Sequence, residues 1–329
     1  MNTPPRARPG GFAHRRLGIA ILRIGVAVGV LVYLFRQVQI ERMLEALRGA
    51  STFWVAAAFA GTMILQWFVA ARLRRLFHTQ DLTLSTFEAF EINLAARFYG
   101  LFLPGGNITG VAVRVLRLAQ VTNSYSGTGV AMAADRLAAT VTLCLIGIVF
   151  WLVERPHQGR IWIGALGLVL FGIAIPTMLI FRRVPMPFLE RLMIPRLGSL
   201  HDALSRFRSL GAADLAVILT LSVAAHLIGI GCFWMLSQAL DLETGLVSMG
   251  WIRSCILLPA ILPVTVAGLG LREGAAILLL GLFGVSEDRA LAFGLLIFAV
   301  TALGVGMVGG FLESWRLLAP RSFRNRDQT

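Results

Sequence analysis

Two stretches decide the fold of this chain: Leu103-Pro104-Gly105-Gly106-Asn107-Ile108-Thr109-Gly110 and Leu262-Pro263-Val264-Thr265-Val266-Ala267-Gly268-Leu269-Gly270-Leu271-Arg272-Glu273-Gly274. Each begins with Leu-Pro, continues through a glycine-rich turn and reaches an arginine nine or ten residues after the proline. Both lie in apolar sequence, and proline and glycine interrupt helices. The pattern therefore predicts two broken helical elements, at 84–123 and 246–284.

The sequence around these stretches is too apolar for a soluble protein. Of its 329 residues, 57% are hydrophobic and 14% are charged, and the mean hydropathy is +0.77. Soluble domains carry about 45–50% apolar and about 25% charged residues. Most of the chain consists of apolar runs about 17–25 residues long, the length of a membrane-spanning helix. We therefore predict an all-α polytopic membrane protein, which excludes a secreted enzyme, a nucleic-acid-binding module and a disulfide-stabilised scaffold.

Six apolar runs are predicted to cross the membrane completely, at 17–35, 51–71, 136–153, 161–181, 212–236 and 290–312. Together with the two broken elements they form one transmembrane domain, 17–315, flanked by the basic segments 1–16 and 316–329. The first run is too long for the core of a signal peptide and lacks a small-residue cleavage site, so it is expected to be a span. Segment 37–49 is amphipathic and is predicted to form a short interfacial helix.

The arginines predict the orientation. All 30 basic residues are arginine, and the net charge is +13. Seventeen of them lie in 1–16, 72–82, 182–210 and 316–329, against 6 in the alternating segments 36–50, 154–160, 237–245 and 284–289. Because basic loops stay in the cytoplasm, both termini are expected to be cytoplasmic. The element at 84–123 must then enter from the cytoplasmic side and that at 246–284 from the outer side. Each is a re-entrant loop or a tight pair of crossings, and the two are inverted.

Broken helices of this kind point to an anion-binding site. A helix that begins inside the membrane exposes unpaired backbone N–H groups, which bind anions, and arginine adds bidentate contacts to phosphate. Paired Gly/Pro-interrupted segments also mark the binding sites of transporters, and charged side chains at membrane depth are functional by default. The predicted substrate-binding residues are Arg97, Asn107, Arg114, Asp135, Arg136, Arg253, Arg272 and Glu273.

A second set of residues is predicted to shape the backbone, because glycine lets the chain approach a ligand closely and flex. Asp135 and Arg136 are expected to open the span at 136–153. The alternative interpretation of the broken stretches is that they are packing kinks, since glycine and proline are common in membrane helices. The predicted hinge positions are Pro104, Gly105, Gly106, Gly110, Pro263, Gly268, Gly270 and Gly274.

Catalytic and cofactor motifs are missing from the sequence. It contains no HExxH, G-x-S-x-G or Walker A pattern and no lysine. Cys144, Cys232 and Cys255 lie in apolar segments without a histidine at ligand spacing and are predicted to be buried. His226 stands alone in an apolar run and is predicted to be a hydrogen-bonded core residue. The chain is therefore not expected to be an enzyme or to bind a metal or cofactor.

Three stretches resemble the lysylphosphatidylglycerol synthase transmembrane-region family of flippase-like integral membrane proteins. They are 93–117, Asp135-Arg136 and 258–274, and size and hydropathy match along nearly the whole chain. Family members commonly carry an acidic residue two positions before the arginine that corresponds to Arg114, whereas this chain has Ala112. The resemblance implies a multi-pass protein of the bacterial inner membrane. The chain lacks the aminoacyl-transfer domain of the fused members and is not expected to make lysylphosphatidylglycerol.

The resemblance further implies movement of a lipid with an anionic head group, a phospholipid or a polyprenyl-phosphate-linked lipid, between leaflets. We expect Arg114 and Arg272 to bind the lipid phosphate in a cavity between the two broken elements. Glu273 is expected to hold Arg272 in position or to contact a basic head group. Two alternatives stay open: a scaffold or accessory subunit for a lipid- or glycosyl-transferase, and a membrane enzyme that acts on a lipid-linked substrate.

Overall fold

The computed structural model describes residues 40–103, 106–154, 210–258 and 270–318, together with 202, 205 and 206. All regular secondary structure in these residues is helical, which confirms the all-α prediction. The predicted spans at 17–35 and 161–181 and the segment 1–16 lie outside the described residues, as does nearly all of 316–329.

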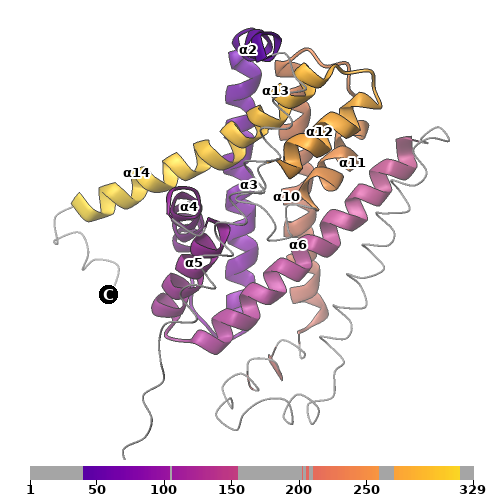
Figure 1. Ribbon diagram of the computed structural model, residues 1–329. Helices are drawn as coiled ribbons and strands as arrows, with labels where there is room; N and C mark the ends of the chain where they lie inside the picture. Colours follow the sequence, from indigo (N-terminus) through magenta and orange to yellow (C-terminus); the bar gives the residue numbers. More distant parts are fainter. Residues whose placement is uncertain are drawn as a thin grey trace, which may run out of the picture.

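Among the described residues, four continuous helices are long and apolar enough to cross a membrane. They are α3 (Thr52–His78), α6 (Tyr125–Glu154), α10 (Ala212–Ala239) and the helix Glu287–Arg316, in which α13 (Glu287–Phe298) and α14 (Val305–Leu318) are joined by the π-helical turn Ala299–Gly304. Figure 1 shows α13 and α14 as one long diagonal helix. These helices coincide with the spans predicted at 51–71, 136–153, 212–236 and 290–312.

Two boundary predictions are wrong. The helix predicted at 51–71 continues to His78, so Arg72, Arg74 and Arg75 lie in α3 and not in a loop. Similarly, α6 begins at Tyr125, so Asp135 and Arg136 lie well inside the helix and do not open it.

Hydrogen bonds explain why α6 begins earlier than predicted. The residues before Asp135 are polar or small, which favours a loop when they are considered alone. In the fold, Ser124 Oγ accepts a hydrogen bond from the Gly127 amide at 3.2 Å, and the hydroxyls of Thr122 and Thr128 lie 3.2 Å apart. The first turn is therefore stabilised by side-chain hydrogen bonds that apolar periodicity does not reveal.

Shorter helices occupy the two regions predicted to be broken. The first region contains α4 (Thr86–Phe102) and α5 (Asn107–Thr122), and the second contains α11 (Leu246–Leu257) and α12 (Leu271–Gly281). The residues that precede α5 and α12 are Gly106 and Gly270, with φ of 56° and 86°. Only glycine adopts such backbone angles readily, so these two glycines set the starts of both helices.

The bundle is held together by antiparallel helix pairs. Helix α3 runs beside α10, because the Ser51 amide donates to the Ala239 carbonyl at one end and Arg72 contacts Ser222 toward the other. Helix α14 crosses α4 so closely that a side chain at Gly309 would overlap with the backbone of Leu94. Such close approach through glycine is typical of membrane helix packing.

One end of the bundle brings together three segments that the arginine count assigned to the same side. The short helix α2 (Ile40–Arg48) lies there beside the start of α13 (Figure 1). Residues from 36–50, 237–245 and 284–289 line a shared cavity of about 380 Å³, among them Arg42, Asp241 and Asp288. This grouping agrees with the predicted alternation, and α2 confirms the helix predicted at 37–49.

Candidate functional site

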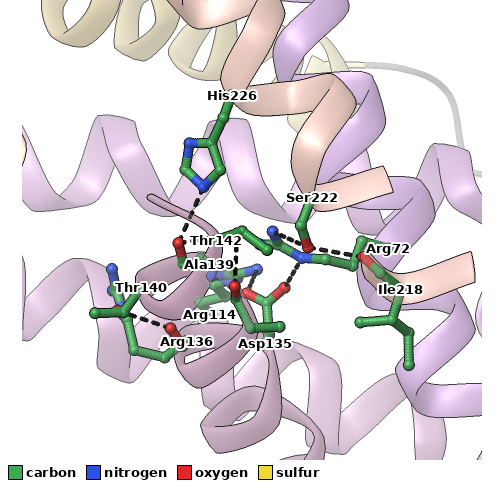
Figure 2. A network of polar contacts seen from close by, with 11 residues as sticks. Arg72, Arg114, Asp135, Arg136, Ala139, Thr140, Thr142, Ile218, Ser222 and His226 are labelled. Carbon is green, nitrogen blue, oxygen red and sulfur yellow. Dashed lines mark hydrogen bonds and ion pairs between the residues drawn. The ribbon is translucent and has the colours of Figure 1, made fainter. Parts of the chain in front are cut away.

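Asp135 lies between two arginines in the interior of the bundle, as Figure 2 shows. Nε of Arg72, from α3, donates to Asp135 Oδ1 at 2.8 Å, and Nη2 of Arg114, from α5, lies 3.5 Å from Oδ2. Arg72 also donates through Nη1 to the hydroxyl of Ser222 in α10 at 3.1 Å. Four helices therefore meet at one buried carboxylate.

The two arginines are held differently. The side chain of Arg72 is 4% exposed and has good hydrogen bonds to both Asp135 and Ser222. The side chain of Arg114 is 17% exposed, its contact with Asp135 is at the outer limit of a hydrogen bond, and its Nε is buried without a partner. Arg72 therefore fixes Asp135 in place, whereas Arg114 retains donors that a ligand could use.

Two more arginines add positive charge to this cluster. The charges of Arg97, in α4, and Arg136, in α6, both act on Arg114 through space. Both side chains are exposed, and Figure 2 shows Arg136 beside Asp135 on α6. We call Arg72, Arg97, Arg114, Arg136 and Asp135 the aspartate cluster. It contains four guanidinium groups and one carboxylate.

The network continues one helical turn further along α6 and α10. His226 follows Ser222 by one turn on α10, and Ala139 follows Asp135 by one turn on α6. His226 Nε2 lies 2.9 Å from the carbonyl oxygen of Ala139, and His226 Nδ1 lies 3.2 Å from Nη1 of Arg253 in α11. The His226 contacts agree with the predicted hydrogen-bonded core histidine, and they connect Arg253 to the same helices that form the aspartate cluster.

Arg272 and Glu273 form a separate pair at the start of α12. Arg272 donates through Nε and Nη2 to Glu273 Oε1 at 3.1 and 2.7 Å, and its guanidinium lies 5.2 Å from the centre of the Phe298 ring. Glu273 is fully buried and accepts a hydrogen bond from the Gly270 amide at 2.7 Å, which caps the helix. These contacts agree with the first of the two roles expected for Glu273, that of holding Arg272 in position. Within the described ranges, no hydrogen bond or ion pair joins this pair to the aspartate cluster.

The predicted hinge residues divide into two groups. Gly106 and Gly270 begin helices, and Gly110 packs against α4, where an added Cβ would lie 2.7 Å from the Ala96 carbonyl. Gly274 has no atom within 4 Å of an added Cβ. Pro104, Gly105, Pro263, Gly268 and the side chain of Asn107 lie outside the described residues.

The sequence interpretation missed Arg72, which was counted as a loop residue. A usable signal was present: once the helix is extended to His78, Arg72 falls one turn before the buried Leu76, on the inner face. It also missed the ion pairs near the C-terminal end of α14, in which Glu313 pairs with Arg117 and Arg316 pairs with Glu91. These pairs join α14 to α5 and α4 and could not be found from spacing along one helix.

The part of the chain that the structure describes contains no candidate metal site and no disulfide bond. No group of three or more histidine, cysteine, aspartate or glutamate side chains is placed to hold a metal ion there. Cys144 and Cys232 are buried and Cys255 is half-buried, and all three are free thiols.

The chain was compared with known protein families. The family described as the lysylphosphatidylglycerol synthase TM region matches residues 20–309. The chain belongs to this family. As a lysylphosphatidylglycerol synthase TM region, it is a multi-pass membrane domain of a type associated with lipid synthesis or translocation. No curated protein matches the chain.

Proposed function

We propose that this protein moves a lipid with an anionic head group, a phospholipid or a polyprenyl-phosphate-linked lipid, between the leaflets of the bacterial inner membrane. The family is associated with lipid synthesis or translocation, and the chain contributes a buried, positively charged cluster that suits a phosphate. The proposed reaction is non-covalent, with the acyl chains remaining in the bilayer while the head group follows a polar path.

The observation that carries this proposal is the charge imbalance of the aspartate cluster. Arg72 and Arg114 contact one buried carboxylate inside the bundle, and the exposed Arg97 and Arg136 add positive charge nearby. Charges at membrane depth are costly and normally pair with opposite charges. A phosphate would supply the missing negative charge and would accept paired hydrogen bonds from guanidinium groups.

Arg72 is held firmly by hydrogen bonds and Arg114 is not, and this difference suggests how the phosphate binds. Asp135 retains Arg72 at 2.8 Å even when its weaker contact with Arg114 is lost. The phosphate then accepts hydrogen bonds from Arg114, including its unpartnered Nε, while Arg97 and Arg136 contribute long-range attraction. Asp135 competes with the phosphate for Arg114, which keeps binding weak enough for release.

The two pairs of shorter helices form the walls of the proposed path. In this proposal α4–α5 enters from the cytoplasmic end and α11–α12 from the outer end, as inverted re-entrant elements with both termini cytoplasmic. Helices α5 and α12 each begin after a glycine with positive φ and carry Arg114 and Arg272. Arg253 provides positive charge along the outer half, whereas Arg272 is neutralised by Glu273. Asn107 lies at the start of α5, in the cytoplasmic half of the proposed path.

The proposal is tested by transport in liposomes. Purified protein is reconstituted with a fluorescent phosphatidylglycerol, and its movement between leaflets is followed by chemical quenching from outside. Arg114→Ala is expected to lower the rate at least tenfold. The matched control is Arg74→Ala, because Arg74 lies on the surface of α3, two residues from Arg72.

Equal rates for the wild type and Arg114→Ala would contradict the proposed path. Absence of transport by any variant, with a transferase retained on purification, would favour the scaffold alternative. Chemical conversion of the lipid during the assay would favour the enzyme alternative.

A further inference from the structure

His226 links two helices through its two ring nitrogens. It lies on α10, is 8% exposed, and contacts α6 through Nε2 and α11 through Nδ1. Figure 2 shows the ring pointing from α10 toward the Ala139 carbonyl, one helical turn from Ser222. The contact with Arg253 completes the bridge between α6, α10 and α11.

The geometry fixes the protonation state of this histidine. A carbonyl oxygen can only accept a hydrogen bond, so Nε2, 2.9 Å from the Ala139 oxygen, carries the hydrogen. Arg253 can only donate, so Nδ1, 3.2 Å from Nη1, must present a lone pair. His226 is therefore neutral in this arrangement, with its hydrogen on Nε2.

Arg253 has no counter-charge among the residues that the structure describes. It is 6% exposed, and no described carboxylate lies within ion-pair distance of its guanidinium. Apart from His226, its contact is the face of the Phe233 ring, 5.6 Å from the ring centre, and its Nε is buried without a partner. A side chain at Gly229 would overlap with the guanidinium, so Gly229 provides the space in which it lies.

The helices packed against α10 carry other charged and titratable groups. Helix α3 contributes Arg72, whose charge also reaches His226, and α6 contributes Asp135 and the thiol of Cys144. Helix α11 contributes Arg253, and α10 itself contributes Cys232. The charged residues of α13 lie at its start, beside Asp241 at the far end of α10. Arg253 is thus the nearest charge to His226.

We propose that uptake of a proton by His226 is coupled to binding of the anionic head group at Arg253. The inference rests on the proposed function, because the anion is the phosphate of the transported lipid. His226 is a positioning residue here and Arg253 is the binding residue.

The coupling between proton and anion follows from the hydrogen bond between Nδ1 of His226 and Nη1 of Arg253. A proton can bind only at Nδ1, which then becomes a donor facing a donor, and the contact with Arg253 is lost. Two adjacent positive charges in a buried site repel each other strongly. A phosphate at Arg253 removes that cost by compensating both charges. Binding of the anion therefore favours binding of the proton, and by linkage the reverse holds to the same extent.

The test measures the dissociation constant for phosphatidylglycerol in neutral detergent between about pH 8 and about pH 5.5, a range in which histidine titrates and a phosphodiester does not. If binding is coupled to one proton, the dissociation constant of the wild type should fall several-fold on acidification. Coupling to a single proton limits this change to about tenfold per pH unit. His226→Gln keeps a donor and an acceptor but cannot take up a proton, so its affinity should not change with pH. The control is His78→Gln, because His78 is exposed at the end of α3; this variant should follow the wild type.

A second measurement uses the wild-type protein alone. Carbon and nitrogen chemical shifts of the His226 ring, in nanodiscs at neutral pH, report which nitrogen carries the hydrogen. A neutral ring with the hydrogen on Nε2 supports the proposal. A hydrogen on Nδ1, or a charged ring, overturns it, and this result does not depend on whether His226→Gln folds.

The outcomes separate this proposal from the proposed function. If phosphatidylglycerol binds in a way that depends on Arg114, but wild type and His226→Gln share one pH dependence, the proton coupling is overturned and the proposed function stands. If phosphatidylglycerol does not bind at any pH, both are overturned.

Discussion

The aspartate cluster and the Arg272–Glu273 pair are both buried and both contain arginine, yet they differ in charge balance. At the start of α12, one guanidinium meets one fully buried carboxylate, which also caps the helix. Around Asp135, two guanidinium groups contact one carboxylate, the exposed Arg97 and Arg136 add positive charge nearby, and Arg114 retains an unpartnered buried donor. The balanced pair is complete without a ligand, whereas the unbalanced cluster has capacity for an anion. Charge balance therefore separates a structural ion pair from a candidate binding site better than burial does.

Glu273→Gln should have the largest effect on stability. It leaves Arg272 buried without a counter-charge and weakens the cap of α12, and removal of one partner from a buried pair costs about 3–5 kcal/mol. The free energy of unfolding in detergent measures this loss. Glu243→Gln is the control, because Glu243 is exposed in the loop before α11. A loss below about 1 kcal/mol would show that the pair is not structural.

Arg72→Met should destabilise the protein by about 3 kcal/mol, because Asp135 then keeps only its long contact with Arg114. The double variant Arg72→Met/Asp135→Leu should recover part of this loss, since it removes both buried charges. Chemical unfolding of the two variants gives the comparison. Equal stability of Arg72→Met and Arg74→Met would refute the assigned role of Arg72.

Gly229→Ala should cost about 2 kcal/mol, because the added methyl group overlaps with the guanidinium of Arg253 and must displace it. Gly231→Ala, on the same helix, meets only the end of Met235 at 3.9 Å and should be nearly neutral. Thermal unfolding of both variants checks the expected difference. Similar melting temperatures for the two would mean that Arg253 does not occupy this space.

Arg114→Ala should have the smallest effect on stability, below about 1 kcal/mol, because Arg114 is partly exposed and its contact with Asp135 is long. The same variant should lose most of the lipid transport activity. Unfolding and transport measured on one preparation separate the two effects. A large loss of stability would assign Arg114 to the framework, together with Arg72.

The sequence was sufficient to predict the helical class and the apolar spans that correspond to α3, α6, α10 and α13–α14, because long apolar runs are local signals. It also predicted the Arg272–Glu273 pair, whose members are adjacent in the chain. The partners of Asp135 were not predictable in the same way. Its partners Arg72 and Arg114 come from two other helices, and Ser222, which accepts a hydrogen bond from Arg72, comes from a third. No spacing rule within one helix connects these residues.

The wrong predictions for the end of α3 and the start of α6 have a related cause. Arginine was taken as evidence of a loop, although a buried aspartate on α6 compensates the charge of Arg72 inside α3. The span predicted at 136–153 leaves out the first residues of α6, whose polar side chains form hydrogen bonds in the first turn. In both cases side-chain hydrogen bonds stabilise polar residues within a helix, although hydropathy alone places these residues outside it.

The most direct test of the central claim is mass spectrometry of the lipids that remain bound to the purified protein. The wild type and the surface variant Arg74→Ala should both retain an anionic phospholipid above its share in the membrane, and Arg114→Ala should lose that enrichment. An identical lipid profile for wild type and Arg114→Ala would contradict the claim that the aspartate cluster binds an anionic head group.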